Sequence, residues 1–279
     1  SISGTVGLNA PSLILNAAIS GGGVTLGGTS ITGNAGGTVS AQNNTIQITG
    51  TGAVDIIDTI TSNGGDITIG AGTTLDLGSG LVSSGGGVVT FTSVNAMDLI
   101  GPVTTSGGAF NADVTGAGAL SIQNDITTSG GNVDITTFNG QLFTLAGSDI
   151  NASGGAGTSS VRLESLNGTQ SLLVGGAVLG GTGGQTLRAG DHVTLNGVIT
   201  SGGPTVITSD SNNGGVGNLA VNAPVQVNGA GSRTLRGRAF TQGATGTLTT
   251  SGGLIDADFT DPYAISEVVS SNGGSISFL

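Results

Sequence analysis

The side chains that could do chemistry in this chain are few and mostly acidic. The 279 residues include one histidine, five arginines, no lysine and 16 acidic residues, which gives a formal net charge of −11. Because neutralising phosphates needs clustered basic residues, this balance excludes nucleic acid as a partner. It also argues against docking to an anionic membrane surface. No apolar run reaches the roughly 18 residues of a transmembrane helix, so no membrane insertion is predicted.

Three aspartates recur at one position of a sequence repeat. Asp55, Asp76 and Asp98 each stand between two apolar residues of a predicted strand, so all three side chains should point outward in one column. Carboxylates one strand spacing apart repel by about 1 kcal/mol in water. Either a bound Ca²⁺ offsets this repulsion, or the column is hydrated and the pKa of the middle carboxyl is raised. The hydrated column is the favoured interpretation, and no other cofactor is predicted.

Basic residues cluster once, near the C-terminal end. Arg236 and Asp258 fall at the same position of successive repeats, which predicts an ion pair between neighbouring coils. Arg233 and Arg238 complete the cluster. As a patch it could bind a sugar acid or a phosphate, but the favoured interpretation is local compensation of the aspartates one coil later: Asp256, Asp258 and Asp261.

Catalytic patterns are missing from the sequence. His192 is the only histidine, no serine stands in a nucleophile-elbow context, and the metalloprotease and phosphate-loop motifs are absent. We therefore expect a surface histidine and no catalytic residue. A polysaccharide-active enzyme is the weakest of three alternatives, because such a groove needs a carboxylate pair and exposed aromatic platforms.

The elements that must position these residues come from a repeat of about 22 residues. It is punctuated by Ser-Gly-Gly turns, as in TSNGGDITI, TSGGNVDI and TSGGLIDA, and turn positions run from Gly22 to Gly274. A period in this range indicates a solenoid. Counting from each turn residue, apolar residues recur at three places, illustrated by Ile67 and Ile69, by Leu75 and Leu77, and by Ile60, Leu81 and Val103.

These three places predict three short strands per coil that point apolar groups at a common axis. The natural closure is an all-β fold, a parallel β-helix of about 12 coils, and crossovers of this kind are right-handed. At about 4.8 Å per coil the rod would be about 58 Å long. We expect a single β-solenoid domain over residues 1–279, with irregular coils and protruding loops around 154–231, including an insertion at Gly154–Ser160.

The repeats resemble those of filamentous-haemagglutinin-type exoproteins and related large bacterial repeat adhesins. The likeness lies in segments such as VDIIDTITSNGGDITIGAGTTLDL (54–77) and ALSIQNDITTSGGNVDITTFNG (119–140), and as a repeat style it covers nearly the whole chain. The resemblance implies a right-handed β-helix at the surface of a Gram-negative cell or outside it. It carries no receptor-binding residue over to this sequence.

The leading functional expectation is a secreted or cell-surface structural stalk without catalysis, and the absence of cysteine is compatible with bacterial secretion. Its partners would be other parts of a longer exoprotein, surface glycans or matrix. The close alternative is a self-assembling extracellular filament, in which coils stack head to tail through Ile2, Ile276 and Phe278. Open solenoid ends carry unpaired strand edges that template such association. Because Ser1 lies inside a repeat, we expect either a processed protein or a piece of a longer one.

Overall fold

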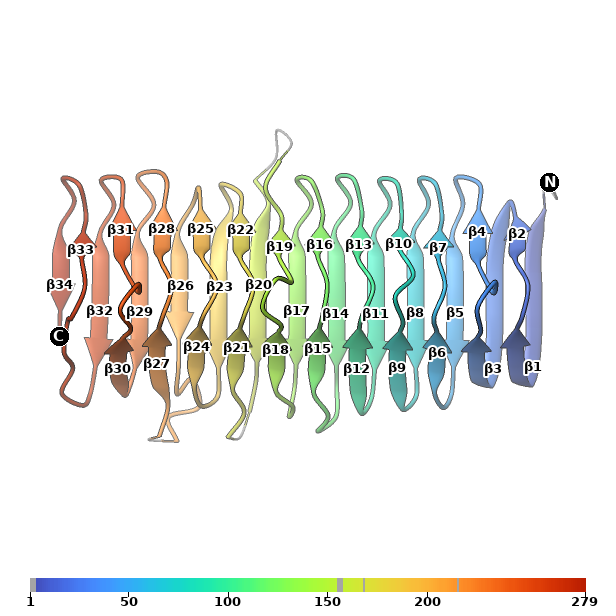
Figure 1. Ribbon diagram of the computed structural model, residues 1–279, viewed down its shortest axis with the longest axis horizontal. Helices are drawn as coiled ribbons and strands as arrows, with labels where there is room; N and C mark the ends of the chain where they lie inside the picture. Colours follow the sequence, from blue (N-terminus) through green and yellow to red (C-terminus); the bar gives the residue numbers. More distant parts are fainter. Residues whose placement is uncertain (1–3, 155–157, 168, 215) are drawn as a thin grey trace.

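The computed structural model describes residues 4–154, 158–167, 169–214 and 216–279 as a stack of coils (Figure 1). Every strand pair in it is parallel, and each strand pairs with the equivalent strand of the next coil. The described residues contain no helix. Accordingly, none of them forms a helix long and apolar enough to cross a bilayer.

Strands fall into three columns, two of which join into one 22-stranded sheet while the third forms a 12-stranded sheet. The first column holds β1 (Thr5–Leu15), β3 (Gly23–Gly33), β5 (Ile46–Gly50), β8 (Ile67–Ala71), β11 (Val89–Ser93), β14 (Phe110–Val114), β17 (Val133–Thr137), β20 (Ser160–Ser165), β23 (Gly184–Ala189), β26 (Thr205–Thr208), β29 (Arg233–Gly237), β32 (Ile255–Phe259) and β34 (Ile276–Phe278).

The second column begins with the C-terminal parts of β1 and β3, which are long enough to serve both columns. It continues through β6 (Val54–Ile56), β9 (Thr74–Leu77), β12 (Ala96–Leu99), β15 (Leu120–Ile122), β18 (Leu142–Thr144), β21 (Leu172–Val174), β24 (Val193–Leu195), β27 (Asn218–Val221) and β30 (Ala239–Gln242).

The third column is made of two- and three-residue strands. It holds β2 (Ile19–Gly21), β4 (Val39–Ala41), β7 (Ile60–Thr61), β10 (Val82–Ser83), β13 (Val103–Thr104), β16 (Ile126–Thr127), β19 (Ile150–Asn151), β22 (Val178–Gly180), β25 (Ile199–Ser201), β28 (Val225–Val227), β31 (Leu248–Thr250) and β33 (Val269–Ser270). In Figure 1 the chain rises on the near face through β6 and β7, descends on the far face through β8, and advances towards the C-terminal end, which is a right-handed path.

One continuous core fills the coil interior, because residues two apart on a strand face the same way. Of the apolar residues predicted to point inward, nearly all are buried, and Phe91 and Phe110 pack edge to face with ring centroids 5.5 Å apart. Leu81 is the exception inside the stack, since Val82 takes its place and pairs with Ile60 and Val103. The link between β9 and β10 is one residue longer than the links between β6 and β7 and between β12 and β13, which shifts the inward position by one.

The Ser-Gly-Gly signature follows from the geometry of the turn. The hydroxyls of Thr105 and Thr128 donate to the carbonyls of Gly108 and Gly131 three residues on, which satisfies buried polar groups at the corner. Gly107 has a φ of 112°, which side chains rarely adopt. At Gly131 a Cβ would lie 1.9 Å from the carbonyl oxygen of Gly108 in the coil before, so the stacking itself requires glycine.

Coils become irregular after β19. Part of the predicted insertion at Gly154–Ser160, residues 155–157, lies outside the described residues. A long connection also follows β26, between Thr208 and Asn218, and it is tied to the preceding coil because the amides of Asp210 and Ser211 donate to the carbonyls of Asp191 and Ala189. This connection forms one wall of the cleft described below.

Candidate functional site

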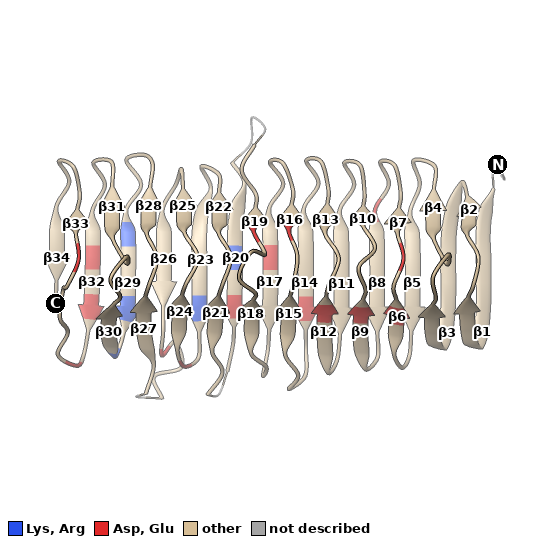
Figure 2. Cartoon of the chain, in the orientation of Figure 1, with Lys and Arg blue, Asp and Glu red and all other residues tan. Residues whose placement is uncertain are grey.

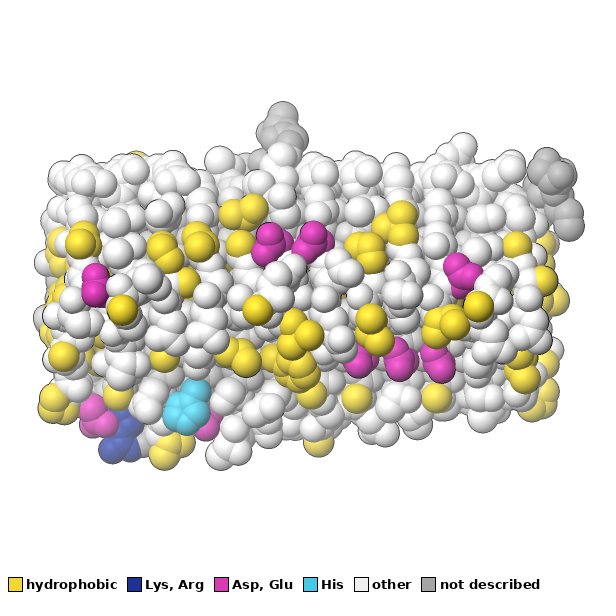
Figure 3. Space-filling view, in the orientation of Figure 1, with side chains coloured by type: hydrophobic (Ala, Val, Ile, Leu, Met, Phe, Trp, Pro, Cys, Tyr) yellow, Lys and Arg dark blue, Asp and Glu magenta, His cyan; other side chains and the backbone are white. Residues whose placement is uncertain are grey.

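The aspartate column has the geometry that the repeat predicts. Asp55 pairs in register with Asp76, and Asp76 with Asp98, on the outer side of β6, β9 and β12. All three side chains are half-buried. Figure 2 shows them as a row of acidic positions on the near face, and Figure 3 shows the same row as adjacent acidic side chains.

Burial is the main cause of a raised pKa at Asp76, and repulsion from Asp55 and Asp98 adds to it. Asp98 accepts a hydrogen bond from the side away from Asp76, because Gln123 Nε2 donates to Asp98 Oδ1 at 2.6 Å. In the part of the chain that the structure describes, no group of three or more histidine, cysteine or acidic side chains is arranged to hold a metal ion. Ca²⁺ binding by the column stays a prediction.

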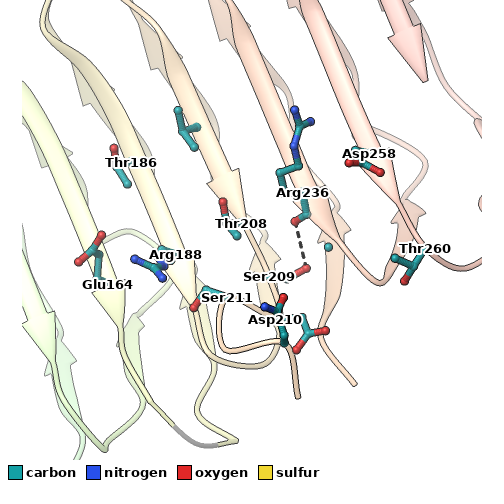
Figure 4. A pocket seen from close by; sticks show the side chains of 13 residues that line it. Glu164, Thr186, Arg188, Thr208, Ser209, Asp210, Ser211, Arg236, Asp258 and Thr260 are labelled. Carbon is teal, nitrogen blue, oxygen red and sulfur yellow. Dashed lines mark hydrogen bonds between the residues drawn. The ribbon is translucent and has the colours of Figure 1, made fainter. Parts of the chain in front are cut away.

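A cleft of about 520 Å³ opens on the outer side of the first column, between β20 and β32 (Figure 4). Its lower wall is formed by Ser209, Asp210, Ser211 and Asn213 of the connection after β26. A volume of this size suits a small polar ligand or one or two sugar rings. Its lining is mostly polar and comes from five successive strands and the connection: Glu164, Thr186, Arg188, Val206, Thr208, Ser209, Asp210, Ser211, Asn213, Arg236, Gly237, Asp258 and Thr260.

Charges of both signs face this cleft. Arg188 is half-buried and forms no ion pair or hydrogen bond with any described residue. Glu164, directly opposite Arg188 across the ladder, is bound instead by Arg162 Nη1 at 3.1 Å. A free guanidinium beside threonine hydroxyls can hold a carboxylate through paired N–H groups. At Arg188 the arrangement could therefore hold the acid group of a polar ligand.

Arg236 stands opposite Asp258 in register, as the repeat predicts, but its ion pair is with Asp256. The predicted partner is thus wrong. Asp256 and Asp258 lie two residues apart on the outer face of β32, and the long arginine side chain reaches the diagonal neighbour. In Figure 4 the Arg236 side chain points away from Asp258, which leaves the Asp258 carboxylate facing the cleft.

The predicted basic cluster is divided between surface and core. Arg238 Nε donates to Asp261 Oδ2 at 2.7 Å, in agreement with local compensation. Arg233, in contrast, is fully buried inside the coil. Its position is two residues after a turn glycine, which is an inward position by the same rule that places Ile67 and Val133. The repeat position of Arg233 therefore predicts a buried side chain. Grouping the arginines by charge alone missed this.

His192 lies at the surface, as expected. Its Nδ1 accepts a hydrogen bond from the Asn218 amide at 3.0 Å, and its Nε2 lies 3.4 Å from Asp191 Oδ1. These contacts orient the ring at the edge of a shallow apolar hollow lined by Phe143 and Leu173. Sequence reasoning missed this hollow, because the two residues replace the polar outward residues of earlier coils in the second column.

At the C-terminal end, β34 pairs with β32 on one side, and no described strand covers its other side. Ile276 is consequently exposed, while Phe278 is half-buried against the Tyr263 ring, with centroids 5.5 Å apart. Ile2, the third residue of the predicted end-to-end interface, lies outside the described residues. Head-to-tail contact through these residues stays a prediction.

Comparison with known proteins found no matching family model, no matching curated protein and no matching solved structure. What the sequence and the structure establish together is the fold, a parallel β-solenoid of about 12 turns with a repeat of about 22 residues.

Proposed function

We propose that this protein is a structural β-solenoid that acts outside a bacterial cell as a stiff stalk of the exoprotein or adhesin kind, without catalysis. The observation that carries the proposal is the unbroken parallel ladder. The first column runs from β1 to β34, and the third from β2 to β33, around one continuous core. Each coil contacts chiefly its neighbours, so length grows with coil number while the outer face is free to vary.

Composition supports an extracellular setting. The chain is acidic, has no cysteine and has no lysine, and its repeats resemble those of filamentous-haemagglutinin-type exoproteins. A net charge far from zero keeps such a rod soluble and discourages lateral association. The partners proposed are other parts of a longer exoprotein, surface glycans or matrix, and the cleft at Arg188 and Asp258 is the place where an acidic glycan would bind.

Two coil deletions test the stalk. Removing residues 88–108 takes out one regular coil and should leave a folded rod shorter by about 4.8 Å, measured by small-angle X-ray scattering. Binding to an array of acidic and neutral glycans should be unchanged. Removing residues 185–204 shortens the rod equally but takes Arg188 away, and it should abolish that binding. A stalk whose glycan binding disappears equally in both deletions would contradict this assignment of the cleft.

Catalysis is tested on the same material. Incubation with acidic and neutral polysaccharides should release neither reducing ends nor unsaturated sugars. If products appear, and disappear in Glu164→Gln or Arg188→Ala, the protein is a polysaccharide-active enzyme and the stalk proposal fails.

A filament subunit is the second candidate, with Ile276 on β34 as a residue that would contact another copy. Exposed strand edges pair with other chains unless they are covered, and a head-to-tail contact that does not close gives fibres. Negative-stain microscopy at rising concentration, with Ca²⁺ and with chelator, should show fibres one coil wide. Ile276→Lys should prevent them, and short rods at every concentration would exclude this candidate.

A further inference from the structure

The inner face of the first column changes character in three consecutive coils. From β5 to β20 the first inward position is apolar, with Ile46, Val89 and Val161 as examples. It then becomes Gln185, Thr205 and Arg233 on β23, β26 and β29, which pair in register, before Ile255 restores the apolar pattern. All three polar side chains are buried, with 3, 1 and 0 % of their surface exposed.

These side chains leave several buried polar atoms without partners. Gln185 Nε2 donates to the carbonyls of Val178 and Thr200, at 3.1 and 2.8 Å, while its Oε1 accepts nothing. Arg233 Nη2 donates to the Thr249 carbonyl at 2.6 Å, while Nε and Nη1 donate to no atom of the described chain. The Thr205 hydroxyl between them is also without a partner. Buried polar groups of this kind are normally satisfied, by ordered solvent or by an ion if not by protein.

The unpartnered atoms belong to three residues that stack in register on successive strands, on the inner face of the first column. Thr200 and Thr249 are equivalent positions of the third column, two coils apart and linked in register through Gln226. Gln185 and Arg233 therefore cross the interior in the same way, from the first column to the third. Thr205, in the coil between them, is too short to make this crossing. Thr205 thus stands between a residue with a free acceptor in the coil before it and a residue with free donors in the coil after it.

Charge decides what kind of group fits between them. No carboxylate makes an ion pair with Arg233 among the described residues, and desolvation lowers the pKa of its guanidinium to about 10. The group is still cationic at neutral pH, and a buried charge without a counter-charge is strongly unfavourable. Only one positive charge is present and the site is closed to solvent, so the counter-charge must be small and monovalent.

We propose that Arg233 and Thr205 form an internal site for a small monovalent inorganic anion of the halide type. Arg233 Nη1 and the Thr205 hydroxyl donate to the anion, and Arg233 Nε, whose N–H lies on the opposite edge of the guanidinium, donates to a second water molecule. A water molecule between the anion and Gln185 donates to both of them, which satisfies Oε1. Every unpartnered atom of the cluster is used, and the guanidinium gains a counter-charge. The site lies within the stack and is independent of the outer cleft.

Anomalous diffraction tests the site directly. Because the cluster is fully buried, an ion exchanges only when coils open, so the full chain is unfolded and refolded in bromide before crystallisation. A bromide peak in contact with the Arg233 guanidinium and the Thr205 hydroxyl is expected. Density at that place with no anomalous signal would show water alone and overturn the proposal. Thr205→Val removes one donor at nearly constant shape, and we expect it to weaken bromide binding about tenfold.

Thermal unfolding gives a second readout without crystals. At constant ionic strength, replacing gluconate by chloride should raise the unfolding temperature of the native chain, because an ion that binds only the folded state stabilises it. Arg233→Met should remove the chloride dependence, whereas Arg236→Met, which deletes the same charge at the surface, should keep it. If Arg233→Met does not fold, Thr205→Val takes its place and should reduce the dependence. A native chain indifferent to chloride would contradict the site.

Discussion

The regular coils from β5 to β17 and the irregular coils from β20 to β32 share the same parallel strand ladder, but they differ in where polar and charged side chains lie. In the regular coils the interior is apolar apart from buried hydroxyls, and every charged residue is an aspartate, three of which form the column. In the irregular coils all five arginines appear (Figure 2). One of them, Arg233, is buried in the core, and a cleft forms on the outer side. The β-helix tolerates insertions and polar substitutions in a few coils because the neighbouring regular coils hold the ladder in register.

The largest effect should come from truncating the aromatic pair of the regular coils. Phe110→Ala removes a fully buried ring and its edge-to-face contact with Phe91, so we expect a loss of about 4 kcal/mol in the free energy of unfolding. The matched change in the irregular coils is Phe240→Ala, next to Phe259. Phe240 retains slight exposure and lies nearer the end of the stack, so its loss should be smaller. Urea unfolding of both variants checks the order, and an equal or larger loss at Phe240 would reverse it.

A methyl group at a stacking glycine should cost slightly less. Gly131→Ala places Cβ against the Gly108 carbonyl and forces two coils apart, and we expect a loss of about 3 kcal/mol. The control is Gly7→Ala, because nothing lies within 4 Å of a Cβ built at Gly7. Circular dichroism during urea unfolding measures both changes. A stable Gly131→Ala variant would mean that coil spacing is more adaptable than the turn geometry indicates.

The aspartate column should show a pH-dependent effect below about 1 kcal/mol, because Asp76 is only half-buried and solvent screens its charge. Its folded-state pKa lies above the ordinary value of 3.8, so folding favours the protonated carboxyl. The penalty is therefore present above the folded-state pKa and is lost as the pH falls to 3.8 and below. Urea unfolding should show that Asp76→Asn stabilises the protein at pH 7 and has no effect at pH 3.

Calorimetric titration with Ca²⁺ separates the two interpretations of the same column. A hydrated column predicts no heat of binding, both in the native chain and in Asp76→Asn. Heat in the native chain that Asp76→Asn abolishes would show that the column binds calcium.

The smallest effect should come from the surface ion pairs next to the cleft. Arg162 binds Asp134 through two nitrogens, at 2.8 and 2.6 Å, on an exposed face. Asp134→Asn leaves the bond of Arg162 to Glu164 in place, so it should cost under about 1 kcal/mol, and the loss should vanish in high salt. It should also lower the pKa of Asp113, which burial and Asp134 raise and which Arg162 opposes. Carboxyl chemical shifts followed through a pH titration measure this change, and an unchanged Asp113 would contradict the coupling.

Much of the fold is predictable from the sequence, because each coil repeats the same pattern of turn residues and inward apolar residues. The turn glycines and the hydroxyl residues before them mark the corners, and alternation of apolar residues marks the inward face, as at Ile67 and Ile69. The prediction fails where one extra residue enters a link. Leu81 is exposed because its link is longer, and nothing in the local pattern distinguishes Leu81 from Val82.

The candidate sites divide in the same way. The aspartate column was predictable, since identical residues at one repeat position must stack. The cleft was not, because its lower wall is the connection after β26, whose path depends on bonds to the preceding coil. The hollow at Phe143 and Leu173 was missed because the outward positions of the second column are polar in the earlier coils.

The sequence by itself determined the solenoid, its period, its three strand columns and the place of the acidic column, because these follow from spacing along the chain. Only the tertiary structure decided that Arg236 bonds to Asp256, that Arg233 spans the core towards Thr249, and that Arg188 faces an open cleft. The physical reason is the length of the arginine side chain. Register fixes which Cα atoms are neighbours, but a long side chain chooses among several partners, and that choice depends on the packing around it.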